Sequence, residues 1–250
     1  MEKLKTGMPG LDELIDGGLP AGGIYGIVGS SGTGKSIFSI EFLYNGAENY
    51  NEPGVCIILE EDKDRMIANM REFGWDLKRL EDASKLRIIP YTKSIVGDVE
   101  ATFDKGIFFG QGKRMESMRQ YLTVDSIYRE IEQSCKSIGA KRVVIDPLTS
   151  IMLLTDNQIT SRIQFLWLVQ KLRRLNVTTL AVIEEGIGYG QDILFLCDGI
   201  VNLIRREKDG MYERGIVIEK IRGSAHDTSI RPFKITKDGI KVYPREVVIR

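Results

Sequence analysis

The sequence predicts an α/β fold in which a mainly parallel central sheet is flanked by helices. Short apolar runs alternate with helical patterns through most of the chain, and this alternation is typical of such sheets. From about Gly199 onward the pattern changes to strands separated by two turn signals, Asp209-Gly210 and Asp238-Gly239, which predict hairpins. We therefore expect the C-terminal part to extend the sheet with antiparallel strands.

The bounds of the elements follow from the same patterns. Apolar runs predict buried strands at residues 24–28, 55–59, 86–91, 142–145 and 178–183. Helical spacing predicts helices at residues 35–49, 64–73, 124–137 and 159–175. Residues 92–121 follow neither pattern, and long irregular segments are usually functional or mobile, so we expect a flexible insertion there.

Length and composition narrow the class of protein. The 250 residues suffice for one large domain, and we expect residues 1–250 to form it. The 35 basic and 35 acidic side chains cancel, so no overall positive field favours nucleic acid or an anionic membrane. No apolar stretch approaches the ~20 residues that span a bilayer, and the N-terminus lacks the apolar segment of a signal peptide, so we expect a cytoplasmic protein. The widely spaced Cys56, Cys135 and Cys197 are expected to be reduced, buried thiols.

The stretch GSSGTGKS, from Gly29 to Ser36, is a complete Walker A motif between a predicted strand and a predicted helix. Its glycines allow successive backbone N–H groups to point at phosphate oxygens ahead of a helix N-terminus. Lys35 is predicted to reach the β and γ phosphates, and Ser36 to offer its hydroxyl to Mg²⁺. The alternative is a glycine-rich turn that caps a helix, and the predicted strand at 24–28 makes a chance match to the motif rarer. The predicted nucleotide-binding residues here are Ser31, Gly32, Thr33, Gly34, Lys35, Ser36 and Ile37.

A second element of a nucleotide site ends the predicted strand RVVID, residues 142–146. A β-branched buried strand that ends in an acid is typical of a Walker B motif. Asp146 is therefore predicted to hold Mg²⁺, through a water molecule. The alternative is an aspartate that ends a strand in the turn before Pro147.

Two adjacent carboxylates, Glu60 and Glu61, directly follow the predicted strand at 55–59. Parallel strands present their C-terminal ends to the ligand crevice, so we expect both side chains near the γ-phosphate, one of them as general base. The alternative is a solvated acidic turn, because acidic runs are often only surface.

These motifs, in this order, resemble the RecA/KaiC superfamily, specifically the single-domain KaiC-like ATPases of archaea and bacteria, of KaiC or RadA-paralogue type. The resemblance covers essentially the whole chain. It rests on TGMPGLDEL at 6–14, GGLPAG at 17–22, LEE at 59–61, IDPLTS at 145–150, KIRGSAH at 220–226 and PFKIT at 232–236. It implies a RecA-like P-loop NTPase core with ATP and Mg²⁺ as cofactors, and slow ATP hydrolysis activated by the adjacent glutamates. It also implies a ring, usually a homohexamer, that binds nucleotide between neighbouring subunits. The first functional hypothesis is that hydrolysis changes the conformation of the ring and so signals to an unidentified protein partner.

The same resemblance gives roles to three residues near the C-terminus. Lys220 and Arg222 match the basic pair that the family inserts into the next subunit's site, where positive charge stabilises the transferring phosphate. Without the family, alternation only places both on one face of a strand, as a solvated edge would. His226 matches a nucleotide-binding position, and a surface histidine in a turn is the alternative.

One departure bears on the type of activity. The phosphorylating half of KaiC proteins carries hydroxyl residues near the subunit interface that accept the γ-phosphate. The corresponding stretch here, before Asp198, is ILFLC at 193–197, which contains no hydroxyl. We therefore expect ATPase activity without autokinase activity.

Two other functions stay open on sequence grounds. The first is a RecA-paralogue regulator of DNA recombination or repair that binds single-stranded DNA. The loops that would contact DNA, at 148–157 and 185–191, contain no Lys or Arg, so the sequence supports this only weakly. The second is a nucleotide-bound scaffold with little turnover. No motif separates ATP from GTP.

Overall fold

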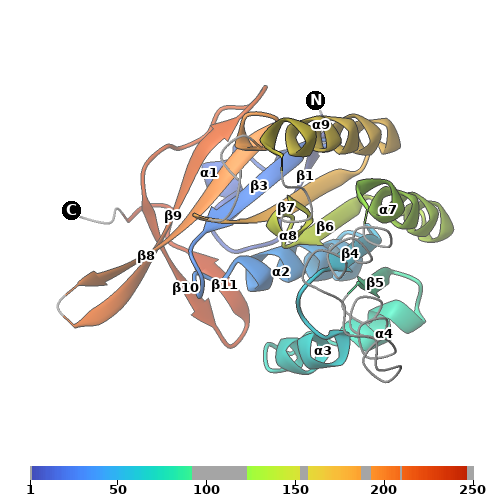
Figure 1. Ribbon diagram of the computed structural model, residues 1–250. Coiled ribbons are helices and arrows are strands. Elements are labelled where there is room, and N and C mark those ends of the chain that lie inside the picture. Colours follow the sequence, from blue (N-terminus) through green and yellow to red (C-terminus); the bar gives the residue numbers. More distant parts are fainter. Residues whose placement is uncertain (1, 92–122, 153–156, 187–192, 209, 247–250) are drawn as a thin grey trace, which may run out of the picture.

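The computed structural model describes residues 2–91, 123–152, 157–186, 193–208 and 210–246 (Figure 1). The predicted insertion at 92–121 lies outside these residues. The described chain builds a nine-stranded sheet in the order β11-β10-β9-β8-β3-β7-β6-β4-β5. None of the helices that the structure describes is long and apolar enough to cross a membrane.

The strands from β8 to β5 in this order run parallel to one another. They are β3 (Ile24–Gly29), β4 (Gly54–Ile58), β5 (Leu86–Pro90), β6 (Arg142–Asp146), β7 (Thr178–Glu184) and β8 (Gly199–Lys208). The five predicted buried strands are all present, with ends within one residue of those expected. Their apolar runs are continuous because helices cover both faces of the sheet.

The C-terminal strands β9 (Met211–Ile221), β10 (Arg231–Thr236) and β11 (Gly239–Val242) extend the sheet antiparallel, as predicted. β8 differs, because it pairs with β3 in parallel. A parallel neighbour requires a crossover, and the chain returns from the end of β7 to the start of β3, where the Asp198 carboxylate accepts the N–H of Ile24 at 3.0 Å. The two expected hairpins join β8 to β9 and β10 to β11.

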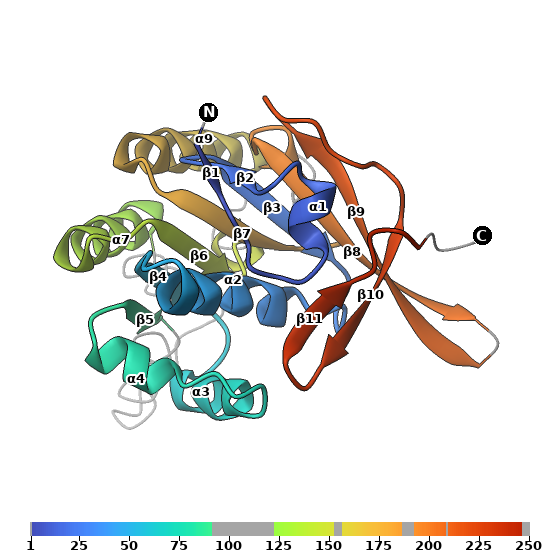
Figure 2. The same ribbon diagram turned by 180° about the vertical axis from the view of Figure 1, so that it is seen from behind.

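Helices cover both faces of the sheet (Figures 1 and 2). On one side lie α2 (Lys35–Asn49), α3 (Lys63–Arg71) and α4 (Leu77–Asp82), and on the other lie α7 (Val124–Ile138), α8 (Thr149–Met152) and α9 (Gln158–Leu175). The sequence pattern missed α4 and α8, and it also missed α1 (Leu11–Leu14), β1 (Lys3–Leu4) and β2 (Leu19–Pro20). Elements of two to six residues are too short for a hydrophobic period to be counted.

Each face of the sheet carries its own apolar core, since successive side chains of a strand point to opposite faces. Val143 and Ile145 pack with α7 and α9, whereas Val144 between them packs with α2. The three cysteines are buried and free, as predicted.

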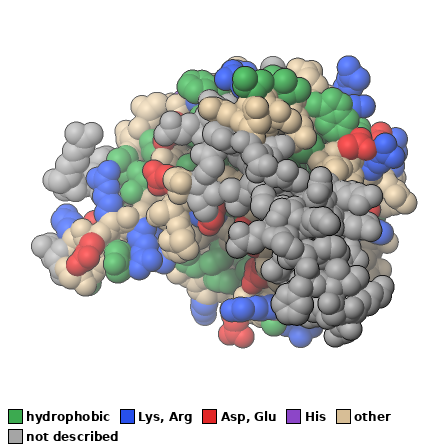
Figure 3. Space-filling view, in the orientation of Figure 1, with side chains coloured by type: hydrophobic (Ala, Val, Ile, Leu, Met, Phe, Trp, Pro, Cys, Tyr) green, Lys and Arg blue, Asp and Glu red, His purple; other side chains and the backbone are tan. Residues whose placement is uncertain are grey.

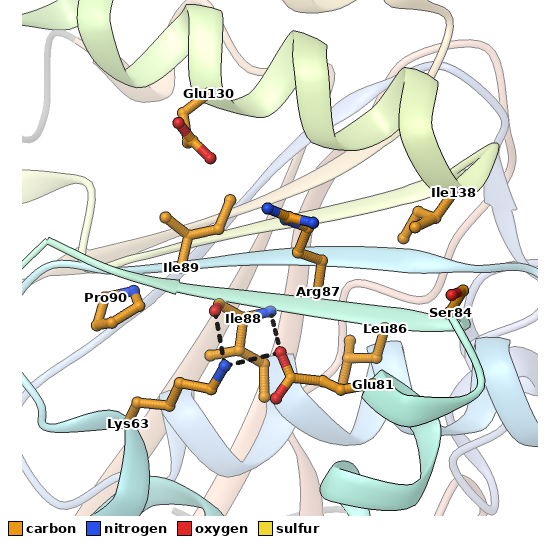
Figure 4. Close-up of a pocket in the computed structure, with 10 residues that line it drawn as sticks. All are labelled: Lys63, Glu81, Ser84, Leu86, Arg87, Ile88, Ile89, Pro90, Glu130 and Ile138. Atoms are coloured by element: carbon orange, nitrogen blue, oxygen red, sulfur yellow. Dashed lines mark hydrogen bonds and ion pairs between the residues drawn. The ribbon is translucent and has the colours of Figure 1, made fainter.

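Two side chains, Lys63 and Glu81, form a polar cap over the main chain of the edge strand β5 (Figure 4). The Lys63 ammonium donates to the Ile88 carbonyl at 3.1 Å and to a Glu81 carboxylate oxygen at 2.8 Å. The same oxygen accepts the N–H of Ile88 at 2.9 Å. A pocket of about 340 Å³ runs along this edge, where Arg87 faces the α7 side together with Glu130. The pocket is built from α3, α4, β5 and α7, apart from the motifs described above.

Arg142, the first residue of β6, is fully buried and joins three segments of the chain. Its guanidinium donates to the carbonyl of Phe42 in α2 at 2.7 Å, to the carbonyl of Lys5 at 2.8 Å and to the Glu52 carboxylate at 2.7 Å. It also lies 4.3 Å from the centre of the Phe42 ring. Gly46 of α2 leaves room for this group, because a Cβ there would lie 2.3 Å from the Arg142 Nε.

Gly46→Ala is expected to destabilise the protein by about 2 kcal/mol, because overpacking against a buried, fully bonded guanidinium forces it to move. Helix propensity alone predicts the opposite, a gain of about 0.5–1 kcal/mol for alanine inside a helix. Urea unfolding of the variant and the wild type checks the sign. A variant more stable than the wild type would contradict the tight packing of Arg142.

Glu41 of α2 is a second buried charged group, with 2% of its surface exposed. Its carboxylate accepts the N–H of Ile240 at 2.7 Å and lies against Gly239 in the β10–β11 turn. Burial raises the pKa of Glu41 to about 8, and the hydrogen bond from Ile240 opposes the rise. In the folded protein the Glu41 carboxyl is therefore mainly protonated at neutral pH.

The raised pKa predicts a pH-dependent stability. Between about 4.5 and 8 the folded chain keeps a proton on Glu41 that the unfolded chain has released. The free energy of unfolding should therefore fall by up to ~1.4 kcal/mol per pH unit in this window from Glu41 alone. Glu41→Gln should gain stability relative to the wild type as pH rises from 5 to 8.5, whereas the exposed Glu72→Gln should not. The free energy of unfolding is measured in urea at each pH. If it changed with pH in the same way for both variants, this role of Glu41 would be disproved.

Candidate nucleotide-binding site

The Walker A motif forms the predicted strand-loop-helix unit, from the last residue of β3 to the first turn of α2. Gly32 and Gly34 have φ angles of +77° and +104°, a left-handed region that favours glycine. A Cβ on Gly34 would also lie 2.9 Å from Ile235 of β10. The predicted residues that lie in this loop and the first turn of α2 are Ser31, Gly32, Thr33, Gly34, Lys35, Ser36 and Ile37.

Lys35 folds back into its own loop. Only 7% of the residue is exposed, and its ammonium donates to the carbonyls of Gly29 and Ser30, both at 2.9 Å. A carboxylate oxygen of Glu184, at the end of β7, lies 3.8 Å away. Glu184 and Glu185 directly follow the predicted strand at 178–183, and this pair of acids is the only sequence signal that Glu184 carries. The lysine charge is thus held at the centre of the loop.

Asp146 ends β6 beside the start of α2, where the Ser36 hydroxyl donates a hydrogen bond to its carboxylate. Burial raises the pKa of Asp146 to about 6, while the Ser36 hydrogen bond and the Lys35 charge oppose the rise. At neutral pH the group is therefore mainly ionised. A hydroxyl and a carboxylate are hard oxygen ligands, and Mg²⁺ in phosphate sites is held by one or two carboxylates with substrate phosphates. These two residues fit that ion.

Glu60 and Glu61 follow β4 and lie near Asp146, which ends the neighbouring strand β6. Both negative charges contribute to the raised pKa of Asp146. Glu60 accepts a hydrogen bond from the hydroxyl of Ser150 in α8, and Glu61 accepts one from the Asn69 amide at 3.1 Å. Asn69 lies in α3 and carries no motif signal in the sequence. The two carboxylates are therefore held in place by neighbouring helices.

Strand register explains why these residues meet. Gly29 of β3 is paired with Glu184 of β7, and Ile58 of β4 is paired with Asp146 of β6. Since all four strands are parallel, their C-terminal ends form one edge of the sheet. Loops at that edge are where open α/β sheets bind ligands.

Lys220 and Arg222 lie at the other end of these strands, beside the start of β3. Register pairs Ile221 with Gly199, and Gly199 with Tyr25 near the start of β3. At a rise of about 3.3 Å per residue, Tyr25 lies about 13 Å from the end of that strand. The Lys220 ammonium and the Arg222 guanidinium donate to the carbonyls of residues 194 and 195, both at 3.1 Å. Burial and the Arg222 charge lower the pKa of Lys220. One chain therefore does not bring this pair to its own Walker A loop.

His226 is found at the same edge as the basic pair. Its ring nitrogen Nδ1 lies 3.2 Å from the carbonyl of Ser224, whose hydroxyl accepts a hydrogen bond from Lys3 of β1. The next residue, Asp227, donates its N–H to the Leu14 carbonyl of α1. Within a single chain the histidine therefore lies with β1 and α1, apart from the phosphate loop.

The sequence of this chain matches a known protein family over almost its whole length. The model of the family described as ATPase: KaiC matches residues 4–247. The chain belongs to the KaiC ATPase family. It is therefore a P-loop ATPase domain of KaiC type. Both the family and the Walker A loop indicate that it binds ATP.

Several relatives of the KaiC type match nearly the whole chain. UPF0273 protein MJ1359 of Methanocaldococcus jannaschii is 34% identical in an alignment of 257 positions that covers 99% of this chain and 99% of that protein. A UPF0273 protein of Thermotoga maritima is 33% identical, with 98% of each chain covered. The circadian clock oscillator protein KaiC of Synechococcus elongatus is 33% identical over 97% of this chain but only 44% of its own length.

A solved structure gives the same result for the fold. The crystal structure of the KaiC-like protein PH0186 from Pyrococcus horikoshii OT3 matches with a TM-score of 0.80 and 33% identity, over 97% of this chain and 99% of that one. The predicted fold class, a RecA-like sheet flanked by helices and extended by antiparallel strands, is confirmed.

Proposed function

We propose that this chain is a Mg²⁺-dependent ATPase whose hydrolytic site is completed by a neighbouring copy in a homohexameric ring. The observation that carries the proposal is the separation of its charged groups. Asp146, Glu60 and Glu61 surround the Walker A loop, whereas Lys220 and Arg222 lie at the far edge of the sheet. Lys35 is the cation that the motif itself supplies to this site, and cations inserted by a neighbour would further stabilise the charge of the transition state.

Different residues of one chain would bind the phosphates, hold Mg²⁺ and activate the attacking water. The backbone of the Walker A loop would hold the phosphates, and Lys35 would exchange its two carbonyl partners for β and γ phosphate oxygens. Ser36 and Asp146 would hold Mg²⁺, which neutralises phosphate charge when bound. Glu60 and Glu61 would orient water and accept its proton, since their carboxylates are placed beside Asp146.

A neighbouring chain would supply Lys220, Arg222 and His226. Their present partners are mostly backbone carbonyls of the same edge, which leaves the basic groups able to turn toward another subunit. Arg222 is exposed, and its guanidinium lies 3.8 Å from the Asp198 carboxylate, a distance typical of a weak surface pair. We propose slow turnover without autokinase activity, coupled to a conformational change that an unidentified protein partner reads.

Glu60→Gln combined with Glu61→Gln is expected to lower ATP hydrolysis by about a hundredfold or more, because removal of a general base has effects of that size. ATP binding should persist, since neither residue belongs to the phosphate loop. Phosphate release in Mg²⁺ and binding of a fluorescent ATP analogue measure the two properties separately. Glu72→Gln, an exposed glutamate beyond α3, is the control. Unchanged turnover in the double variant would remove the base assignment.

Action across an interface predicts complementation between two inactive variants. Lys35→Ala loses its own site but keeps its basic pair, whereas Arg222→Ala keeps its site and lacks the donor. In an equal mixture about a quarter of the head-to-tail interfaces join an intact site to an intact arginine, so about a quarter of wild-type activity should return. Light scattering must show that each variant still assembles. Assembly of both without any recovery would refute action in trans.

A further inference from the structure

The hairpin of β8 and β9 extends beyond the body of the sheet, and its base passes the Walker A loop (Figure 1). Val201 and Leu203 of β8 pack in the same core as α2. The carbonyl of Leu203 lies so close to Gly29 that a Cβ on Gly29 would be 2.5 Å from it. Arg205 is the next residue on this face, because alternate residues of a strand share a face.

Arg205 places its guanidinium against the phosphate loop. A Cβ on Gly32 would have the Arg205 Nη1 as its nearest neighbour, at 3.0 Å. The side chain is exposed, and its guanidinium carbon lies 3.7 Å from the centre of the Tyr212 ring on β9. In the part of the chain that the structure describes, no carboxylate is paired with Arg205. A cation is therefore held beside Gly32 by an aromatic ring.

A second arginine increases the positive charge at this place. Arg214 of β9 is directly opposite Arg205 in the strand register, and like charges so placed destabilise a strand pair. The Nε of Arg214 is buried without a hydrogen-bond partner among the described residues. Lys and Arg side chains are visible on the projecting hairpin (Figure 3). A bound anion would relieve this repulsion.

We propose that Arg205 is a further phosphate-binding residue of the same chain, which contacts the β and γ phosphates of ATP beside Gly32, and that Tyr212 holds its guanidinium there. Gly32 lies in the loop that ends in Lys35, the residue that the motif places at those phosphates. Guanidinium groups match phosphate oxygens with paired, charge-assisted hydrogen bonds. The inference rests on the proposed function in that ATP is the ligand.

A matched pair of arginine variants tests the proposal. Arg206 is the next residue of β8, is also exposed, and points to the opposite face of the strand. Arg205→Ala should weaken binding of a fluorescent ATP analogue by about tenfold, the effect of losing a hydrogen bond to a charged group. Arg206→Ala removes the same charge and should stay within about twofold of the wild type. Equal affinities for the two variants would overturn the proposal.

A double-mutant cycle tests the role of Tyr212, because residues that act as one unit are not additive. Tyr212→Leu should weaken ATP binding by about threefold, in line with an exposed cation–π contact. In the background of Arg205→Ala the same change should have no further effect. Fully additive losses would show that the ring does not act through Arg205.

Thermal unfolding without nucleotide distinguishes phosphate binding by Arg205 from a purely structural role. A structural role would lower the unfolding midpoint of Arg205→Ala below that of Arg206→Ala. We expect instead the same midpoint or a higher one, because Arg205→Ala also removes the repulsion from Arg214. If the wild type binds no ATP, the proposed function and the role of Arg205 fail together. If the wild type and Arg206→Ala bind ATP and Arg205→Ala binds equally well, only the role of Arg205 fails.

Discussion

The buried guanidinium of Arg142 sets the geometry on which the site depends. It binds α2 through the carbonyl of Phe42 and stands at the start of β6, whose last residue is Asp146. α2 begins at Lys35, so this one side chain fixes the Walker A helix relative to the Walker B strand. A buried charge is tolerated only when it is fully bonded, and here the Glu52 carboxylate and two carbonyls provide those bonds.

Parallel strands then bring the reactive groups together without further adjustment. The ends of β3, β7, β6 and β4 carry the phosphate loop, Glu184, Asp146 and the glutamate pair. The antiparallel return of β9 has the opposite effect, because it carries Lys220 and Arg222 back to the start of β3. The same hairpin passes the phosphate loop at Arg205 on its way. One supersecondary unit thus touches both the site of its own chain and the surface proposed to serve a neighbour.

The sequence predicted those parts of the fold in which burial leaves a long signal. Strands covered on both faces appear as apolar runs, and the bounds of α2 were predicted correctly because a glycine-rich loop precedes it. The direction of β8 was not predictable, since a strand pattern contains no information on its neighbours. In the site, the motif residues Lys35 and Asp146 were identified from spacing, whereas Glu184 and Arg205 reach the loop only through tertiary register. The distance of Lys220 and Arg222 from the Walker A loop likewise follows from the pairing of β8 with β9, which the sequence motif does not specify.

The polar cap on β5 has a consequence for how copies of this chain can associate. A foreign strand that added to this edge would have to displace Lys63 and Glu81 from the main chain of Ile88, and lose both of those hydrogen bonds before it gained any. Exposed, unpaired sheet edges are the usual starting points of fibrils. The cap therefore opposes uncontrolled growth by sheet extension at β5, and leaves assembly to surfaces where side chains rather than backbone decide which partner fits.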